Sequence, residues 1–373
     1  MFSRGSAKVL TTVKANGFNK STIAKANTAF FGRRMFSHGG KDDAMKSGVG
    51  GAVFGDPKNE NIRIYMNTEG TGSGRYVPRE QAMVSVFDSG FILGDGVWEG
   101  LRMYNGKWLC LDKHLQRLYE ACKYMDINIG VSPKELERDL QELVNVNGMK
   151  SGCHARLMVT RGEKYTPYQG PAVNKGPATI VCIAEHKPPA TIDSPAQQNG
   201  IKLHTVHVRR GYADVQDQKL NSHSKINCVT ACIAAKKAGA DEGLMLDPHG
   251  QVATCNSVHF FIVRNGEVWT SGGNYCIPGI TRGNILELCR KNGIPAFEKD
   301  FSLYECYGAQ EAFVTGTFGG ITPVSEIDGR QIGCNLYDSW NEDGAIPSFE
   351  VGPMTRRLQS LYNDMVIEQC GGL

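Results

Sequence analysis

Short runs of alternating apolar and polar residues dominate the first half of the patterned region, residues 61–186. The run "NIRIYMN" (61–67) alternates and predicts a strand, and "CHARLMVTRG" (153–162) and "ATIVCIAEH" (178–186) predict two more. An Asn-Gly pair between apolar residues in "YNGKW" (104–108) predicts a hairpin. This half therefore contains a sheet.

Two helices are predicted between these strands. In "DKHLQRLYEACKYMDI" (112–127) apolar residues recur at helical spacing, and Asp112 is the expected N-cap. The second, "SPKELERDLQELVNVNG" (132–148), has Ser132 as its cap, Pro133 at the first helical position and Gly148 as its stop.

Residues 201–373 show a second mixture of strand and helix patterns. "IKLHTVHVRR" (201–210) predicts a strand, and "KINCVTACIAAKKAGA" (225–240) predicts a helix that ends near Gly239. Further strands are expected within 243–271, joined by turns at 248–250 and 265–266, and at 311–317 and 322–329. Further helices are expected at 281–293, 302–309 and 353–366.

One break in composition separates the two halves. Residues 187–200, "KPPATIDSPAQQNG", hold three prolines and no apolar periodicity, which is typical of a linker. The patterns therefore predict an α+β protein with an N-terminal domain at 61–186, a linker at 187–200 and a larger C-terminal domain at 201–373. Residues 42–60 are weakly patterned and are expected to be a flexible segment.

Charge is distributed unevenly along the chain. Residues 1–41 contain eight Lys and Arg and no acid, with interleaved apolar residues, which is typical of a mitochondrial transit peptide. Of the 41 basic residues in the chain, these eight leave 33 against 38 acidic ones, so the body is mildly acidic. No basic stripe for nucleic acid and no apolar run of about 18 residues are present, so neither a nucleic-acid partner nor a membrane span is expected. The expected location is the mitochondrial matrix.

The twelve cysteines are scattered and form no C-x-x-C. Cys228 and Cys232 are four residues apart and near His223, a weak metal-site pattern. Free thiols are the favoured interpretation, in agreement with a reducing compartment.

Three short segments carry glycines and polar groups beyond what packing requires. They are "GDGVWEGLRMY" (94–104), "PGITRGNI" (278–285) and "VTGTFGGIT" (314–322). Backbone amides at a helix start, with hydroxyls beside them, bind phosphate well, although Gly-Thr turns also serve as plain caps.

A polar stretch, "DVQDQKLNSHSKINCV" (214–229), contains Lys219 and Lys225 with no carboxylate between them. A lysine amine in a sheltered loop can bond to an aldehyde once burial and nearby cations lower its pKa. Together with a phosphate site, this predicts pyridoxal 5′-phosphate (PLP). The alternative is a pair of solvated lysines.

The order of these segments resembles that of class IV, fold-type IV, PLP-dependent aminotransferases. This family includes branched-chain aminotransferases, D-amino-acid aminotransferases and aminodeoxychorismate lyase. The resemblance runs from about Arg63 to the C-terminal helix through "GDGVWEGLRMYNGKW", "HLQRL", "LMVTRG", "GADEGLMLDPHGQV", "PGITR" and "FVTGTFGGITPVSEIDG". It implies a small α/β sandwich domain, a larger pseudo-barrel domain that binds PLP, and a homodimer.

The residue that anchors the cofactor departs from the family. Counted back without gaps from "GADEG", the family's Schiff-base lysine falls on Asn221. Either a short insertion restores Lys219, or the amine has moved to Lys225, one helical turn further on. Lys225 is preferred, because the positive end of the helix that begins there disfavours an ammonium.

The resemblance also assigns the other cofactor residues. Arg117 in "HLQRL" is similar to the arginine that binds the cofactor phosphate, and Ile280, Thr281 and Thr317 are expected to complete that site. Thr254 stands where the family usually has a glutamate that pairs with the pyridine nitrogen. A hydroxyl stabilises a carbanion less well than a carboxylate does there.

Five residues fall where relatives place substrate-side groups: Trp98, Arg102, Arg156, Arg161 and Phe318. Trp98 corresponds to an aromatic position of the side-chain pocket. Arg156 aligns with an arginine near the substrate carboxylate of branched-chain enzymes, and Arg161 aligns better with that of D-amino-acid enzymes. Phe318 follows a turn that offers its backbone amide to the substrate.

The function expected from this resemblance is amino transfer between an amino acid, of branched-chain type, and a 2-oxo acid such as 2-oxoglutarate. The alternatives are a D-amino-acid aminotransferase and a PLP-dependent lyase of the aminodeoxychorismate type, for which Thr254 argues. A catalytically idle binding or scaffold protein is the third possibility, because positions 221 and 254 both depart from the family.

Overall fold

The computed structural model describes residues 56–70, 72, 74–191, 193–333 and 348–373. All of them belong to one compact unit, Met45–Leu373. The transit peptide expected at 1–41 lies outside the described residues, as do residues 42–55. Of residues 42–60, which are expected to form a flexible segment, the last four lie in a 3-10 helix (η1, Pro57–Asn61) that is capped by Asp56.

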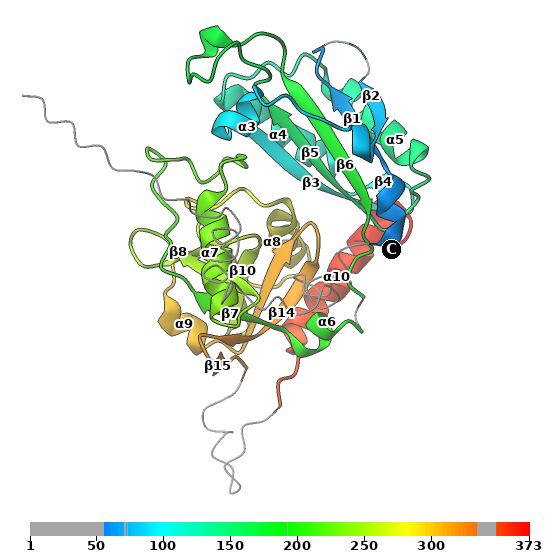
Figure 1. Ribbon diagram of the computed structural model, residues 1–373. Coiled ribbons are helices and arrows are strands. Elements are labelled where there is room, and N and C mark those ends of the chain that lie inside the picture. The colour runs from blue at the N-terminus through cyan, green and yellow to red at the C-terminus, as the bar shows by residue number, and fades with distance from the viewer. Residues whose placement is uncertain (1–55, 71, 73, 192, 334–347) are drawn as a thin grey trace, which may run out of the picture. The chain divides into compact units, whose positions relative to one another are not determined.

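The N-terminal half forms a six-stranded antiparallel sheet in the order β2-β1-β6-β5-β3-β4 (Figure 1). Its strands are β1 (Arg63–Asn67), β2 (Arg75–Pro78), β3 (Gly96–Tyr104), β4 (Lys107–Trp108), β5 (Cys153–Thr160) and β6 (Thr179–His186). The expected hairpin joins β3 to β4, with Asn105 and Gly106 at φ 45° and 76°. The predicted strands and hairpin are therefore confirmed.

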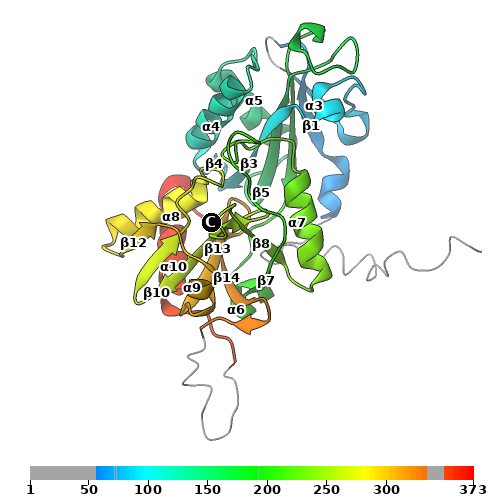
Figure 2. The ribbon, with the colours of Figure 1, turned by 90° about the vertical axis from the view of Figure 1, so that its left-hand side faces the viewer.

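Two helices cover one side of this sheet (Figure 2). Helix α4 (Leu111–Tyr124) packs on β3, and α5 (Pro133–Val146) packs on β1 and β6. Leu115 and Leu118 of α4 and Leu136 and Leu140 of α5 are buried in this core. The helical spacing of these leucines thus gives one buried face per helix.

The start of α5 is as predicted, and that of α4 is not. Ser132 and Glu135 form a reciprocal capping box, with Pro133 at the first helical position. The N-cap of α4 is Cys110, in a left-handed conformation with φ 52°, rather than Asp112. The chain enters this helix directly from the short β4, so Asp112 lies in the first turn, where a carboxylate still faces the positive end of the helix dipole.

The C-terminal half forms a nine-stranded mixed sheet in the order β12-β11-β10-β13-β14-β7-β8-β9, with β15 beside β14. Its strands are β7 (Ile201–Thr205), β8 (Glu242–Leu246), β9 (Val252–Cys255), β10 (His259–Arg264), β11 (Glu267–Thr270), β12 (Ala296–Glu298), β13 (Glu311–Gly316), β14 (Gly320–Ile327) and β15 (Arg330–Gln331). Strand β9 also contacts β10, so the sheet curls toward closure. The predicted α+β class with a pseudo-barrel is confirmed.

Helices pack on several sides of this curled sheet (Figures 1 and 2). Helix α7 (Ile226–Lys237) lies against β7 and β8, while α8 (Ile280–Lys291) and α10 (Pro353–Cys370) pack on each other and on β13. The shorter elements are η2 (Arg79–Gln81), α3 (Ser89–Leu93), η3 (Pro171–Val173), α6 (Pro195–Asn199) and α9 (Leu303–Tyr307).

Part of the proline-rich segment 187–200 is helical, although its composition is typical of a linker. It contains α6, which packs on β14, and Gln197 is buried there and donates a hydrogen bond to the carbonyl of Ile321. The domain boundaries placed on either side of this segment stay predictions.

Backbone contacts tie the loop before α7 to strand β3. The N–H of Trp98 donates to the carbonyl of Asn221, the N–H of His223 donates to the carbonyl of Gly96, and Val97 forms a β-bridge with Ser222. The polar stretch 214–229 is therefore fixed beside β3. In the part of the chain that is described, no helix combines the length and apolarity that crossing a membrane requires.

Candidate active site

Two adjoining cavities lie between β3, the loop before α7 and the curled sheet. Their volumes are about 330 and 270 Å³. We call them the first and second cavity. They share seven wall residues, namely Trp98, Arg156, Asn221, Ser257, Val258, His259 and Ile277. The shared wall makes them two compartments of one site.

The start of α8 and the β13–β14 turn meet on the wall of the first cavity. Ile280, Thr281 and Thr317 all line it, as the sequence predicted for a phosphate site. Gly279 is the N-cap of α8 and makes no side-chain cap bond, and the first amides of a helix have no partners within it. The hydroxyl of Thr315, buried on the same wall, has no hydrogen-bond partner within the described residues. These groups fit an oxyanion.

The backbone at Gly279 lies so close to the ring of His259 that a residue with a side chain would not fit there. A Cβ at this position would lie 2.3 Å from the ring of His259. The Nε2 of His259 is 2.9 Å from the carbonyl of Ile277, and burial lowers the pKa of the imidazole to about 4. A neutral His259 therefore holds the turn that leads into α8.

Arg117 of α4 lines the first cavity and is oriented by a buried carboxylate. Its Nε and Nη2 donate to Glu99 at 2.8 and 2.7 Å, and its Nη1 donates to the carbonyl of Pro278 at 2.6 Å. Burial alone would raise the pKa of Glu99, but hydrogen bonds from His114 and Arg117 outweigh it and hold that pKa below its usual value. The guanidinium is thus pinned beside the start of α8.

Glu99 was not among the residues predicted from the sequence. The signal was available: Glu99 lies on β3 inside one of the three glycine-rich segments, and His114 and Arg117 are three residues apart on α4. Residues at that spacing share a helix face.

Lys225 and Lys219 have different surroundings. Lys225 is the N-cap of α7 and lines the second cavity, with its Nζ 5.6 Å from the ring centroid of Trp98. Burial, followed by smaller effects of Arg210 and other cations, lowers the pKa of this amine to about 8. Lys219 is exposed and lines neither cavity.

Asn221, at the position of the family lysine, lies on the shared wall. Its Nδ2 donates to the carbonyl of Trp98 at 2.6 Å, while its buried Oδ1 has no partner in the described part of the chain. An amide cannot form an imine. Of the three residues considered for the anchor, Lys225 alone places an amine on a cavity wall.

Thr254 of β9 is buried and lines the second cavity, and its hydroxyl donates to the carbonyl of Val258. Arg210, which was not predicted from the sequence, lines the same cavity and donates to the carbonyl of Tyr275. No Asp or Glu is among the described residues that line the two cavities, whereas five cations are: Arg117, Arg156, Lys187, Arg210 and Lys225. The site therefore favours anionic ligands.

Three of the five expected substrate-side residues line the first cavity. The guanidinium of Arg156 stacks on Trp98, with its Cζ 3.7 Å from the ring centroid, and Phe318 lines the same cavity. His154, not predicted from the sequence, packs edge-on against Phe318, and burial, aided by neighbouring cations, lowers its pKa to about 3. The wall thus combines aromatic surface with a fixed cation.

Arg102 lies behind this wall rather than on it. It is fully buried, and its guanidinium donates to the carbonyls of Lys187 and Phe318. The structure gives Arg102 the task of holding the Phe318 turn. Arg102 was expected to contact the substrate, but its guanidinium donates to backbone carbonyls behind the wall instead.

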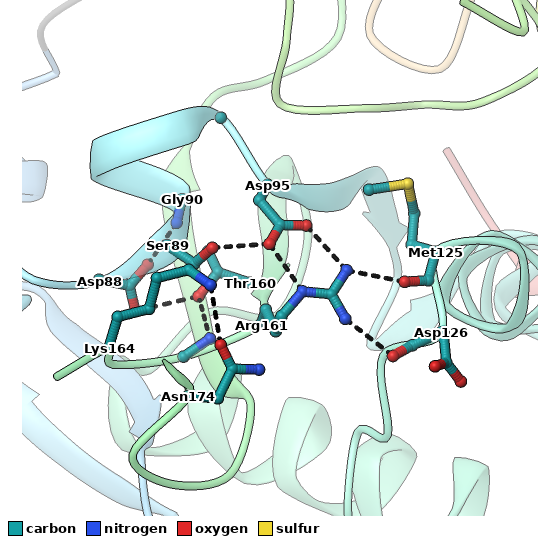
Figure 3. Close-up of polar contacts among 12 residues, drawn as sticks. Asp88, Ser89, Gly90, Asp95, Met125, Asp126, Thr160, Arg161, Lys164 and Asn174 are labelled. Carbon is teal, nitrogen blue, oxygen red and sulfur yellow. Dashed lines mark hydrogen bonds and ion pairs between the residues drawn. The ribbon is translucent and has the colours of Figure 1, made fainter. Parts of the chain in front are cut away.

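Arg161 also lies on neither cavity wall. Figure 3 shows its guanidinium directed at Asp95, to which Nε and Nη2 donate at 2.7 and 3.1 Å. It also donates to the carbonyls of Met125 and Asp126. Burial alone would raise the pKa of Asp95, but Arg161 and Ser89 outweigh it and lower that pKa. The donors of Arg161 are thus used within the protein.

Neither a metal site nor a disulfide is found in the described parts of the chain. No group of three or more His, Cys, Asp or Glu side chains could hold a metal ion there. Eleven cysteines, Cys228 and Cys232 among them, are free thiols, so the prediction of free thiols is confirmed for these.

Comparisons with known proteins agree on one family. A family model described as "Amino-transferase class IV" matches residues 96–327. "Branched-chain-amino-acid aminotransferase-like protein 2" of Arabidopsis thaliana is 37% identical over 83% of this chain, and "Putative branched-chain-amino-acid aminotransferase" of Methanocaldococcus jannaschii is 36% identical over 82%. The chain spans about half the length of the Arabidopsis relative (51%) and 96% of the archaeal one.

A solved structure gives the same result. A branched-chain amino acid aminotransferase of T.th. with pyridoxamine 5′-phosphate is similar at a TM-score of 0.71 and 30% identity. The match covers 83% of this chain and 95% of that one.

Proposed function

The chain belongs to the class IV aminotransferase family, and from that premise we propose that it transfers an amino group between a branched-chain amino acid and a 2-oxo acid, using PLP bound to Lys225. Class IV aminotransferases are PLP enzymes, and a structural neighbour holds pyridoxamine 5′-phosphate. The observation that carries the proposal is the amine of Lys225, which faces a cavity lined by cations and by no described carboxylate.

The residues present fit PLP. The unpaired amides at the start of α8, with Thr317 and the remaining N–H groups of Arg117, offer a site for its phosphate. Thr315, buried without a partner among the described residues, offers one more hydroxyl. When bound, PLP supplies the electron-withdrawing ring that weakens the bonds at the amino acid's Cα.

Besides holding the cofactor, Lys225 would move a proton at the substrate. With a pKa of about 8, its amine is partly neutral at neutral pH and can take a proton from Cα and return it. Burial and the positive end of α7 both favour the neutral amine.

The first cavity supports a substrate with an apolar side chain and a carboxylate. Trp98, Phe318 and Val314 supply apolar surface, and Arg156 and Lys187 supply positive charge. The second carboxylate of a substrate such as 2-oxoglutarate would pair with the same cations, Arg156 and Lys187. The M. jannaschii and T.th. relatives, named for branched-chain amino acids, support this substrate class.

A half-reaction screen tests the proposal. The PLP-loaded protein is mixed with single L- and D-amino acids and no 2-oxo acid, and the cofactor absorbance is followed. Leucine, isoleucine or valine of L configuration should convert the cofactor in one half-reaction, and 2-oxoglutarate should restore the original cofactor. Conversion by D-amino acids alone would contradict the substrate class, and no conversion on the whole panel would contradict transamination.

A lyase is the second candidate, and Thr254 favours it. No carboxylate among the described residues lines the cavity near Thr254. The cofactor ring would therefore be a weaker electron sink than a ring whose nitrogen pairs directly with a glutamate. The same mixtures distinguish the two reactions. A lyase continues to form product without a 2-oxo acid, whereas an aminotransferase stops after one half-reaction.

We further propose a homodimer formed through the segment 83–93. Several of its apolar side chains are exposed, with Met83 at 77%, Val86 at 68% and Phe91 at 76%. Grouped exposed apolar residues are typical of protein interfaces. The segment leads into β3, whose Trp98 lines both cavities.

Location in the mitochondrial matrix is also a proposal. It is supported by the acid-free, basic composition of residues 1–41. A fusion of these residues to a fluorescent protein should be imported into mitochondria, and replacing Arg33 and Arg34 by Glu should reduce import. A fusion that stays outside mitochondria would contradict it.

A further inference from the structure

A buried carboxylate lies directly behind the shared wall of the two cavities. Glu242 is the first residue of β8 and is 2% exposed. Its Oε1 accepts a hydrogen bond from the hydroxyl of Ser257 at 2.5 Å, and its Oε2 accepts one from the N–H of Ser257 at 3.2 Å. The nearest cation of α7, Lys236, pairs instead with Asp241. Glu242 is therefore held by a hydroxyl and an amide rather than by a cation.

Ser257 connects this carboxylate to the site. It lines both cavities, so one hydroxyl separates the carboxylate of Glu242 from a bound ligand. The turn that carries Ser257 is fixed by Asn256, whose Oδ1 accepts from the N–H of Gly243 at 2.6 Å and whose own N–H donates to the carbonyl of Gly243. The backbone of β8 thus fixes the position of Ser257 relative to Glu242.

Among the described residues that line the second cavity, none is an Asp or Glu. The hydroxyl of Thr254 is used by the carbonyl of Val258, and no described residue on the wall carries a carboxylate. A ligand group that exchanges a proton near neutral pH would meet Ser257 and, through it, Glu242.

The groups around Glu242 keep its proton exchangeable. Burial raises its pKa to about 7, while Ser257 and Lys236 act in the opposite direction and Asp241 adds to the rise. Cys232 of α7 and Cys255 of β9 are the other titratable groups beside it, and burial raises the pKa of both thiols, so they stay neutral. Glu242 thus changes charge in the pH range in which the enzyme would work.

We propose that Glu242 and Ser257 form a proton-holding pair that acts on the ring nitrogen of the bound cofactor. The pair exchanges one proton: as the nitrogen gives its proton to the oxygen of Ser257, the hydroxyl proton of Ser257 passes to Glu242, and the reverse restores the protonated ring. No electrons are transferred. The inference rests on the proposed function, because it needs PLP in the two cavities, with its phosphate at Thr281 and Thr317 and its ring toward Lys225.

The test uses pyridoxine 5′-phosphate labelled with ¹⁵N, which has no aldehyde and binds without a covalent bond. The pKa of its ring nitrogen is measured by NMR on the wild-type chain and on Glu242→Gln and Ser257→Ala. The control is Glu305→Gln, which alters the matched Ser302–Glu305 pair, whose members line neither cavity.

In wild type and control, the ring nitrogen should keep its proton to a pH at least about one unit higher than in the other two variants, a tenfold change in proton affinity. Equal ring pKa values in all four proteins would overturn the inference and leave the proposed function standing. A shift in Glu242→Gln but not in Ser257→Ala would overturn the role of Ser257.

A second measurement separates failure of the pair from failure of cofactor binding. A ¹³C-carboxyl NMR titration of the ligand-free protein should show one glutamate that titrates near neutral pH, absent from Glu242→Gln and shifted in Ser257→Ala. A Glu242 that titrates like exposed glutamates would overturn the inference even if the cofactor binds. Failure of wild type to bind pyridoxine 5′-phosphate at all would overturn the proposed function and the inference with it.

Discussion

At the scale of single residues, environment rather than identity separates the two lysines of residues 214–229. Lys219 is exposed, and Lys225 is held at the start of α7 against Trp98. Both have the same side chain, but only in Lys225 does burial remove much of the solvation that stabilises an ammonium. Function at this position therefore depends on where the fold places the amine.

The rate at which PLP attaches to the cofactor-free protein should follow the neutral form of Lys225. Because the pKa of this amine is lowered to about 8, the rate should rise about tenfold per pH unit below pH 8 and level off above it. Stopped-flow absorbance measures it. A rate that continues to rise toward pH 10 would indicate a solvated lysine instead.

Arg161 should prove structural rather than substrate-binding. Arg161→Gln removes both bonds to Asp95 and leaves a partly buried carboxylate with Ser89 but without its cation, so the free energy of unfolding should fall by roughly 2–3 kcal/mol. KM for the amino acid should stay within about twofold of wild type, because Arg161 lines neither cavity. Denaturant unfolding and steady-state kinetics check the two parts. A large rise in KM at unchanged stability would restore the expected substrate contact.

At the scale of elements, the site is assembled from places where strands and helices start or end. The start of α8, the turn between β13 and β14 and the start of α7 each offer backbone or side-chain groups to the cavities. Helix starts have unpaired amides and a positive dipole end, so phosphate and neutral amine are both favoured there.

Two glycines of α8 provide a matched pair of substitutions. Gly279→Ala places a Cβ 2.3 Å from the ring of His259, so the start of α8 must move and PLP affinity should fall at least tenfold. Gly283→Ala meets nothing within 4 Å and lies inside the helix, so it should raise the free energy of unfolding by roughly 0.5–1 kcal/mol and leave affinity unchanged. Equal PLP affinities in the two variants, measured by fluorescence titration, would contradict the assignment of this turn to phosphate.

At the scale of the whole molecule, two sheets that are separate along the chain share one site. Arg102 of β3 holds the Phe318 turn, and Arg117 of α4 reaches the carbonyl of Pro278. The exposed apolar segment 83–93, where we propose that two chains associate, leads into β3, whose Trp98 lines both cavities.

Phe91→Glu should weaken association between chains. A charge at a side chain that is 76% exposed in one chain costs little for folding, but it is unfavourable in an apolar interface. Light scattering should give twice the mass of one chain for wild type and a lower mass for the variant. The control is Tyr304→Glu, at a tyrosine that is 79% exposed on α9. A single-chain mass for wild type would contradict the homodimer.

The sequence predicted the elements and much of the wall, because periodicity and turn residues are local signals. The segments "PGITRGNI" and "VTGTFGGIT" do meet at one cavity. Long-range partners were not predictable: Arg161 pairs with Asp95, 66 residues away, and Ser257, in the turn after β9, donates to Glu242 of β8. Nor could charge pattern alone decide between Lys219 and Lys225, because burial is a property of the folded chain.

Borohydride reduction of the PLP-treated protein, followed by peptide mapping, tests the central claim most directly. The account predicts that the reduced cofactor is attached to the peptide that contains Lys225, that Lys225→Ala abolishes the label, and that Lys219→Ala retains it. A label on Lys219, or no label on a protein that still transaminates, would contradict it.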